Sequence, residues 1–114
     1  MSSLKGDRRA YELAAFALHD PDDRTRRAAV LAVRWLAEPA AIEHLIPLTH
    51  DRDVHVRSVV GETIGSLAVD SDRLQEATAT LLSQLAAPAP EVRAGTGRGL
   101  GVLGGPLGAD DDNR

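Results

Sequence analysis

Apolar residues recur along this chain every three or four positions, in segments separated by short polar turns that carry Asp and Pro. This period is typical of amphipathic helices that bury one face and expose the other. In the second such segment Ala29, Val33 and Leu36 fall on one side of a helix, and Arg27 and Arg34 on the other. We therefore predict an all-α fold, with helices at about 6–19, 21–37, 39–50, 52–68, 71–86 and 89–103.

The predicted helix starts carry ordinary capping residues. Asp20 stands where the N-cap of the second helix belongs, and Pro21 follows at the first helical position. Asp51 stands at the same place before the fourth helix, and Asp70 or Ser71 is expected to cap the fifth.

The helices form pairs that repeat along the chain. The turn at 18–26 recurs 31 positions later at 49–57, with His, Asp, Asp and Arg coinciding, and a more divergent copy at 87–93 follows after 36 more. Each copy ends on an arginine, and apolar positions downstream of it also coincide: Val33, Ile64 and Leu100, then Leu36, Leu67 and Leu103. Self-similarity of this kind predicts stacked helix–turn–helix repeats.

The turn motif resembles the HEAT family, in particular the HEAT-like repeats of bacterial proteins related to phycobilin lyases. In that family a turn Asp precedes, by six residues, an Arg at the start of the second helix. The pairs Asp20–Arg26 and Asp51–Arg57 match this spacing, whereas Ala87 replaces the Asp in the third copy. Val-Arg at 56–57 and 92–93 also matches, and Thr25 departs from it.

The resemblance covers about residues 6–104 and implies a short right-handed α-solenoid of three repeats. It also implies that Arg26, Arg57 and Arg93 bond turn carboxylates and carbonyls of neighbouring repeats, so we assign them a structural role. We expect one domain at 1–104, with repeats at about 6–37, 39–68 and 71–103, and a disordered acidic tail at 105–114. Four glycines in the last predicted helix mean that it either packs very closely on its neighbour or frays: Gly95, Gly97, Gly99 and Gly101.

The concave side of a solenoid, lined by the second helix of each repeat, is its usual binding surface. A helical wheel places on this side Arg24, Arg27, Leu31, Arg34 and Trp35 of the first repeat. The repeat offsets add His55, Ser58, Glu62, Gly65 and Ser66, then Glu91, Ala94, Arg98, Gly101 and Val102. From these the candidate binding residues are Arg24, Arg27, Arg34, Trp35, His55, Glu62 and Arg98. The alternative is a merely solvated face, with Trp35 covering the end of the first repeat.

Candidate chemistry beyond binding is sparse. The absence of cysteine excludes disulfides, thiolate zinc sites and cysteine nucleophiles. His19 and His50 stand at the ends of first helices, where a cation suits the helix dipole, so they need no metal to explain them. The glycine pattern at 99–104 fits a dinucleotide-binding loop, but helix signals rather than a strand precede it. We predict no metal, no cofactor and no enzymatic activity.

The leading functional prediction is a non-catalytic protein-binding module: an adaptor, regulatory or assembly subunit. One alternative, resting on the resemblance, is an accessory factor of lyase-like or chaperone-like type that acts on another protein. A second is weak nucleic-acid binding through Arg24, Arg27 and Arg34, which the net charge of −4 makes unfavourable. Self-association through an end helix is a further expectation, because the first and last helices lack a polar outer face. No signal peptide or membrane span is recognisable, so we expect a cytoplasmic protein.

Overall fold

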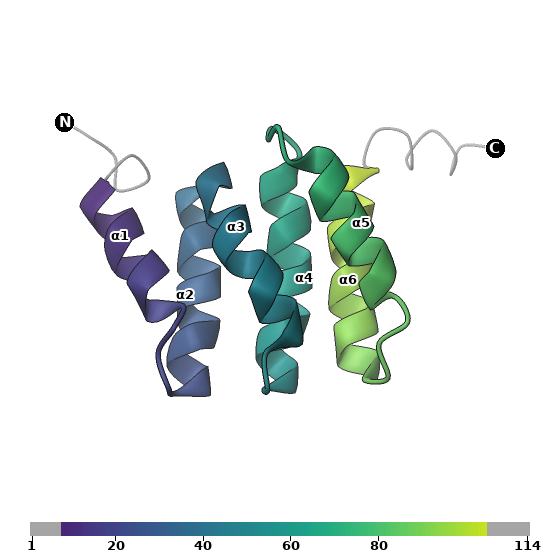
Figure 1. Cartoon of the computed structure of the whole chain (residues 1–114), viewed down its shortest axis with the longest axis horizontal. Coiled ribbons are helices and arrows are strands. Elements are labelled where there is room, and N and C mark those ends of the chain that lie inside the picture. Colours follow the sequence, from purple (N-terminus) through teal and green to yellow (C-terminus); the bar gives the residue numbers. More distant parts are fainter. Residues whose placement is uncertain (1–7, 105–114) are drawn as a thin grey trace.

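The computed structural model describes residues 8–104, and this part of the chain is a short all-α solenoid (Figure 1). The first helices of the three repeats form one layer, and the second helices form a layer behind it (Figure 1). The first layer comprises α1 (Arg8–Ala17), α3 (Ile42–Leu45) and α5 (Leu74–Gln84). The second comprises α2 (Asp23–Leu36), α4 (Val54–Ala68) and α6 (Pro90–Leu103). The predicted tail at 105–114 lies outside the described residues.

The core lies between the two layers and is almost entirely aliphatic. Its largest fully buried side chains come from both layers: Leu18, Ile42, Leu45, Ile64 and Leu81. The apolar positions aligned by the repeat are buried in the first two repeats, and Leu100 and Leu103 pack partly buried against the same core. The repeat pattern therefore correctly identified the face that each second helix buries.

The start of α2 lies two residues later than predicted. Asp22, not Asp20, is the N-cap, and its carboxylate accepts a hydrogen bond from the Arg24 backbone N–H at 2.8 Å. Asp20 instead accepts from the Asp22 backbone N–H at 2.8 Å, which shapes the turn and leaves Pro21 outside the helix. Both aspartates suit a cap, and the tertiary contacts of the turn decide which one takes the role.

The same correction applies to α4 and to α5. Asp53 rather than Asp51 caps α4, accepting from the Val56 backbone N–H at 2.9 Å. Ser71 does not cap α5 either, because its hydroxyl accepts the Arg73 N–H before the helix begins.

The predicted third helix at 39–50 is helical but not continuous. It consists of a 3₁₀ turn at Pro39–Ala41, the short α3, and a second 3₁₀ segment at Ile46–His50. Pro47 lies in the first turn of that last segment. Because proline lacks an N–H and its ring crowds the carbonyl four residues earlier, it interrupts the α-helical hydrogen-bond ladder here.

Arg26 links the first two turns as the family resemblance implies. Its side chain is buried and forms a bidentate ion pair with Asp51 of the next repeat, at 2.8 and 2.9 Å. The same guanidinium donates to the carbonyls of Asp20 and Pro21 in its own turn. Burial alone would raise the pKa of Asp51, but hydrogen bonds from Arg26 and the Asp53 N–H outweigh it and lower that pKa.

The later arginines retain only part of this arrangement. Arg57 donates to the carbonyl of Asp51 at 2.6 Å, and Arg93 donates to the carbonyls of Ala87 and Pro88 at 2.8 Å. Ala87 has no carboxylate with which to pair Arg57. Within residues 8–104 an arginine–carboxylate link between adjacent turns is therefore present once, between the first and second repeats.

Glycines allow α4 and α6 to pack backbone against backbone. A Cβ at Gly65 would overlap the backbone of Gly99, and one at Gly99 would overlap the carbonyl of Gly61. A Cβ at Gly95 would likewise overlap the carbonyl of Ser58. Of the two outcomes that the glycines left open, the close packing of the last helix is confirmed.

Candidate functional site

The candidate surface is the side of α2, α4 and α6 that points away from the first-helix layer. Four of the seven predicted side chains are exposed there, and the other three are half-buried. Arg24, Trp35, His55 and Arg98 are exposed, and Arg27, Arg34 and Glu62 are intermediate. The wheel therefore placed all seven candidates outside the core.

Three of the candidates meet across the three second helices. Glu62 of α4 pairs with Arg34 of α2 at 3.2 Å and with Arg98 of α6 at 3.1 Å. The Glu62 side chain is 28% exposed, so both pairs lie in a partly desolvated seam and are less screened than fully exposed pairs. The structure thus joins Glu62, in the middle of the predicted surface, to basic residues on either side.

The predicted surface is wrong at two positions of α4. The repeat offset predicts that Ser58 and Gly65 are exposed, yet both are buried. They lie on the edge of α4 that contacts α6, where the glycine packing closes the space between the helices. The equivalent positions of α2 hold Arg27 and Arg34, which are too long for such a contact.

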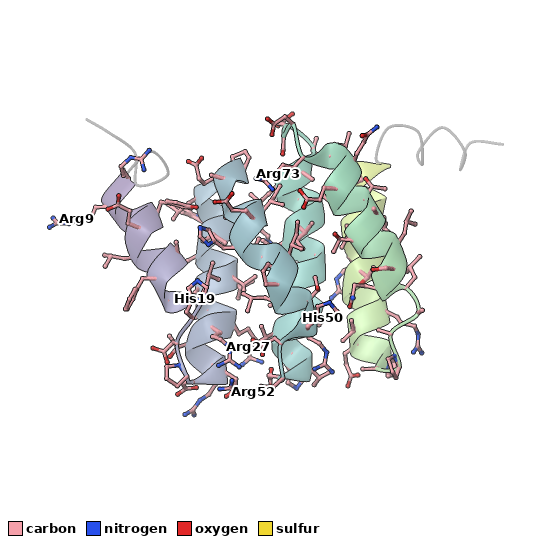
Figure 2. The ribbon with its side chains drawn as sticks, viewed as in Figure 1. Arg9, His19, Arg27, His50, Arg52 and Arg73 are labelled. Carbon is pink, nitrogen blue, oxygen red and sulfur yellow. The ribbon has the colours of Figure 1, made fainter. Side chains whose placement is uncertain are left out.

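The first repeat contributes the largest exposed side chains of this surface. Trp35 is 57% exposed and Leu31 is 44% exposed, four residues apart and therefore on one face of α2. Arg27 lies beside the seam between α2 and α4 (Figure 2). Within residues 8–104 its side chain has neither an ion pair nor a hydrogen bond, in contrast to Arg34.

Arg24 belongs to the helix cap more than to the surface. Its guanidinium contacts the Asp22 carboxylate at 3.4 Å, and its side chain is 80% exposed. The backbone and side-chain hydrogen bonds from Arg24 lower the pKa of Asp22. His55 is exposed in the first turn of α4.

Leu31 belongs to this surface but is not among the seven candidate binding residues. The wheel placed it on the right arc, but a lone leucine among arginines carried no chemical signal. Because Leu31 is exposed beside Trp35, the two side chains together form an apolar patch, whereas the candidate residues include Trp35 alone. The usable signal was the spacing of two large apolar residues by four positions on a face that is otherwise polar.

Metal chemistry finds no support in the described part of the chain. No group of three or more His, Asp, Glu or Cys side chains is placed to hold an ion among residues 8–104. His19 contacts His44 of the neighbouring first helix edge to face, with ring centroids 6.1 Å apart.

Comparison with known protein families identifies the repeat. The model of HEAT repeats matches residues 4–65, which is more than half of the chain and spans the first two repeats. The chain belongs to the HEAT repeat family. No curated protein matches the sequence. Within the described residues, none of the HEAT helices is both long enough and apolar enough to cross a membrane.

Proposed function

We propose that this HEAT-repeat domain is a non-catalytic protein-binding module. We propose that it binds its partner with the candidate surface, the side of α2, α4 and α6 that points away from the first-helix layer. HEAT repeats commonly mediate protein–protein interactions, and this face holds the predicted candidates. The observation that carries the proposal is the Arg34–Glu62–Arg98 bridge, which ties all three second helices into one surface beside exposed Trp35.

The composition of the α2 part of this face suits a binding hot spot. Trp35 and Leu31 offer a large apolar area, and Arg27 offers a guanidinium that has no carboxylate partner among residues 8–104. Tryptophan and arginine are enriched among the residues that dominate binding energies, because both combine contact area with directional chemistry. The adjoining cations favour a partner segment that carries carboxylates next to an apolar residue.

The ion-pair bridge also prepares the face for binding. Glu62 restrains the side chains of Arg34 and Arg98, so less side-chain entropy is lost when a partner covers them. Because Glu62 is shared by two arginines, the bridge keeps a net positive charge, which extends the basic character from α2 towards α6.

A capture experiment with matched variants tests this proposal. The immobilised chain is incubated with a lysate of the source cells, and bound proteins are quantified by mass spectrometry. A partner of this face should be lost with Trp35→Ala and weakened with Arg27→Ala. Arg73→Ala removes the same charge from the first-helix layer, where Arg73 pairs with Glu43 and Glu76, and should leave capture unchanged (Figure 2). Equal capture by all of these variants would refute the proposed face.

The same experiment separates the alternatives. Nucleic-acid binding should fall steeply with salt and disappear after nuclease treatment, whereas a protein partner held partly by Trp35 should survive moderate salt. Two of the three arginines that this alternative needs already face carboxylates, Arg24 facing Asp22 and Arg34 facing Glu62. An accessory factor of the lyase-like type would instead yield coloured material when co-expressed with a pigment protein.

A further inference from the structure

The α4–α6 contact has an exposed counterpart on the other edge of α6. Moved by the repeat offset of 36 positions, Ser58, Gly61 and Gly65 of α4 become Ala94, Gly97 and Gly101. All three of these α6 residues are exposed, and a Cβ at Gly97 or Gly101 would meet no atom within 4 Å. Glycine weakens a helix relative to alanine, and within the described chain no close contact accounts for its use at these two positions.

The opposite end of the solenoid carries the complementary positions. Gly95 and Gly99, the residues that α6 presents to α4, correspond to Ala28 and Ala32 of α2 after the combined offset of 67 positions. Ala28 is exposed and Ala32 is intermediate. The edge of α2 that faces away from α4 therefore carries small residues at the positions that correspond to Gly95 and Gly99 in the α4–α6 contact.

Large apolar side chains accompany this edge on α1. Phe16 is 81% exposed and Leu13 is 66% exposed. By the offset of 31 positions Leu13 corresponds to His44, which contacts His19 in the turn that follows α1. Leu13 is therefore on the side of α1 that points out of the solenoid, the side on which Arg9 also projects (Figure 2). At the other end, Leu82 of α5 and Leu85, which caps the helix, are exposed.

We propose that a second copy of this chain stacks its α1–α2 end on the α5–α6 end of the first, so that the solenoid continues from one molecule into the next. In this junction Ala28 and Ala32 of one copy lie along Ala94, Gly97 and Gly101 of the other, at a slightly larger separation than the all-glycine internal contact. Phe16 and Leu13 then cover Leu82 and Leu85 of the other copy.

The second copy is the occupant because the junction repeats an interface that the molecule already contains. The α4–α6 contact shows that a second helix with small residues four apart is covered by the next second helix in the same orientation. The head-to-tail geometry joins two different surfaces, so it does not close after two copies and each end remains available for growth. This association is separate from the proposed partner binding, since it does not use Trp35 or Arg27.

Two half-blocked variants of the full chain test the direction of stacking. Leu13→Glu with Phe16→Glu blocks the α1–α2 end, and Gly97→Glu with Gly101→Glu blocks the α5–α6 end. All four positions are exposed, and glutamate is the better helix former at the glycines, so both variants should fold with a wild-type circular dichroism spectrum. A control with the same charge change, Val69→Glu with Leu74→Glu, alters exposed residues that flank the turn between α4 and α5.

The measurement is sedimentation velocity over a wide range of protein concentration. We expect the average mass of the wild type and of the control to rise with concentration beyond that of a dimer. Each half-blocked variant alone should remain at the monomer mass, and an equimolar mixture of the two should stop at the dimer, because only one productive junction can form. A wild type that stays monomeric at its highest soluble concentration would overturn the proposal. So would a half-blocked variant that dimerises alone, since that requires like ends to meet, or a mixture that stays monomeric.

Discussion

Restoring the missing turn carboxylate is the sharpest test of the repeat chemistry. Ala87 occupies the position of Asp20 and Asp51, and Arg57 occupies that of Arg26, which binds Asp51 through two hydrogen bonds. We predict that Ala87→Asp creates the equivalent bidentate pair with Arg57. The new carboxylate should also accept the Ala89 N–H, as Asp51 accepts that of Asp53 at 2.9 Å.

The expected gain follows from the contacts at the equivalent turn. Each hydrogen bond to a charged group contributes about 1.5–3 kcal/mol, whereas the desolvation of a carboxylate and its place near the C-terminal end of α5 offset most of that sum. Arg57 is already half-buried and ordered by its bond to the Asp51 carbonyl, so little further side-chain entropy is lost. We therefore expect a net stabilisation of about 1 kcal/mol, equivalent to a rise in Tm of about 4 °C for a domain of this size.

Thermal unfolding followed by circular dichroism at neutral pH measures this gain. Ala87→Asn is the matched control, because it can accept the same backbone N–H but carries no charge, and it should give less than half of the effect. In a double-mutant cycle, Arg57→Gln should remove most of the gain from Ala87→Asp. If Ala87→Asp is no more stable than Ala87→Asn, or if the cycle shows no coupling to Arg57, the assignment of these arginines as carboxylate links is refuted.

Three further predictions concern the packed core and the existing turn. Gly65→Ala should destabilise the fold by about 3 kcal/mol, because its Cβ would meet α6 backbone, while Gly97→Ala in open space should stabilise it by up to about 1 kcal/mol; urea unfolding of both variants checks the contrast. Thr63 is fully buried and its hydroxyl has no hydrogen-bond partner among the described residues, so Thr63→Val should raise stability by about 1 kcal/mol, and a lower Tm would contradict this. Hydrogen bonds from Arg26 and the Asp53 N–H lower the pKa of Asp51 in the folded state below the unfolded value of about 3.9. The Arg26–Asp51 ion pair therefore stabilises the fold above about pH 4, and this contribution is lost as the pH falls through the folded pKa. Asp51→Asn should cost about 3 kcal/mol at neutral pH and flatten the loss of stability in acid, as measured by thermal unfolding at a series of pH values.

The repeat itself could be predicted because its signals are local and redundant. Each turn repeats a charged pattern, and each second helix repeats the spacing of buried positions such as Val33 and Ile64. The caps could not be assigned as reliably, since Asp20 and Asp22 are both good N-caps and only the tertiary contacts distinguish them. The break in the third helix does have a local signal, because Pro47 lies inside the predicted segment 39–50 and disfavours a continuous α-helix there.

The sequence predicts which side chains of the second helices point towards the candidate surface, but it does not predict which of them contact one another. A wheel gives the direction in which Glu62 points, but whether it meets Arg34 and Arg98 depends on the distances between neighbouring helices. Those distances are set by residues elsewhere on the helices. The burial of Ser58 and Gly65 could not be deduced from α4 alone, because it results from the glycines of α6.

The seam between α2 and α4 and the seam between α4 and α6 differ in width because different residues line them. This difference explains where the side chains suited to binding a partner gather. Gly61 and Gly65 let α4 and α6 approach along their length, so this seam is closed by backbone contacts. In the seam between α2 and α4 the equivalent positions hold Val30 and Arg34, so these helices stand further apart and long side chains cross the gap. Side chains that span a wide seam keep their ends at the surface, whereas at the glycine seam the helices meet through their backbones and the Glu62–Arg98 pair lies beside that contact. The first seam therefore has room for recognition chemistry, and the tight second seam fixes the register in which Glu62 meets arginines on both sides.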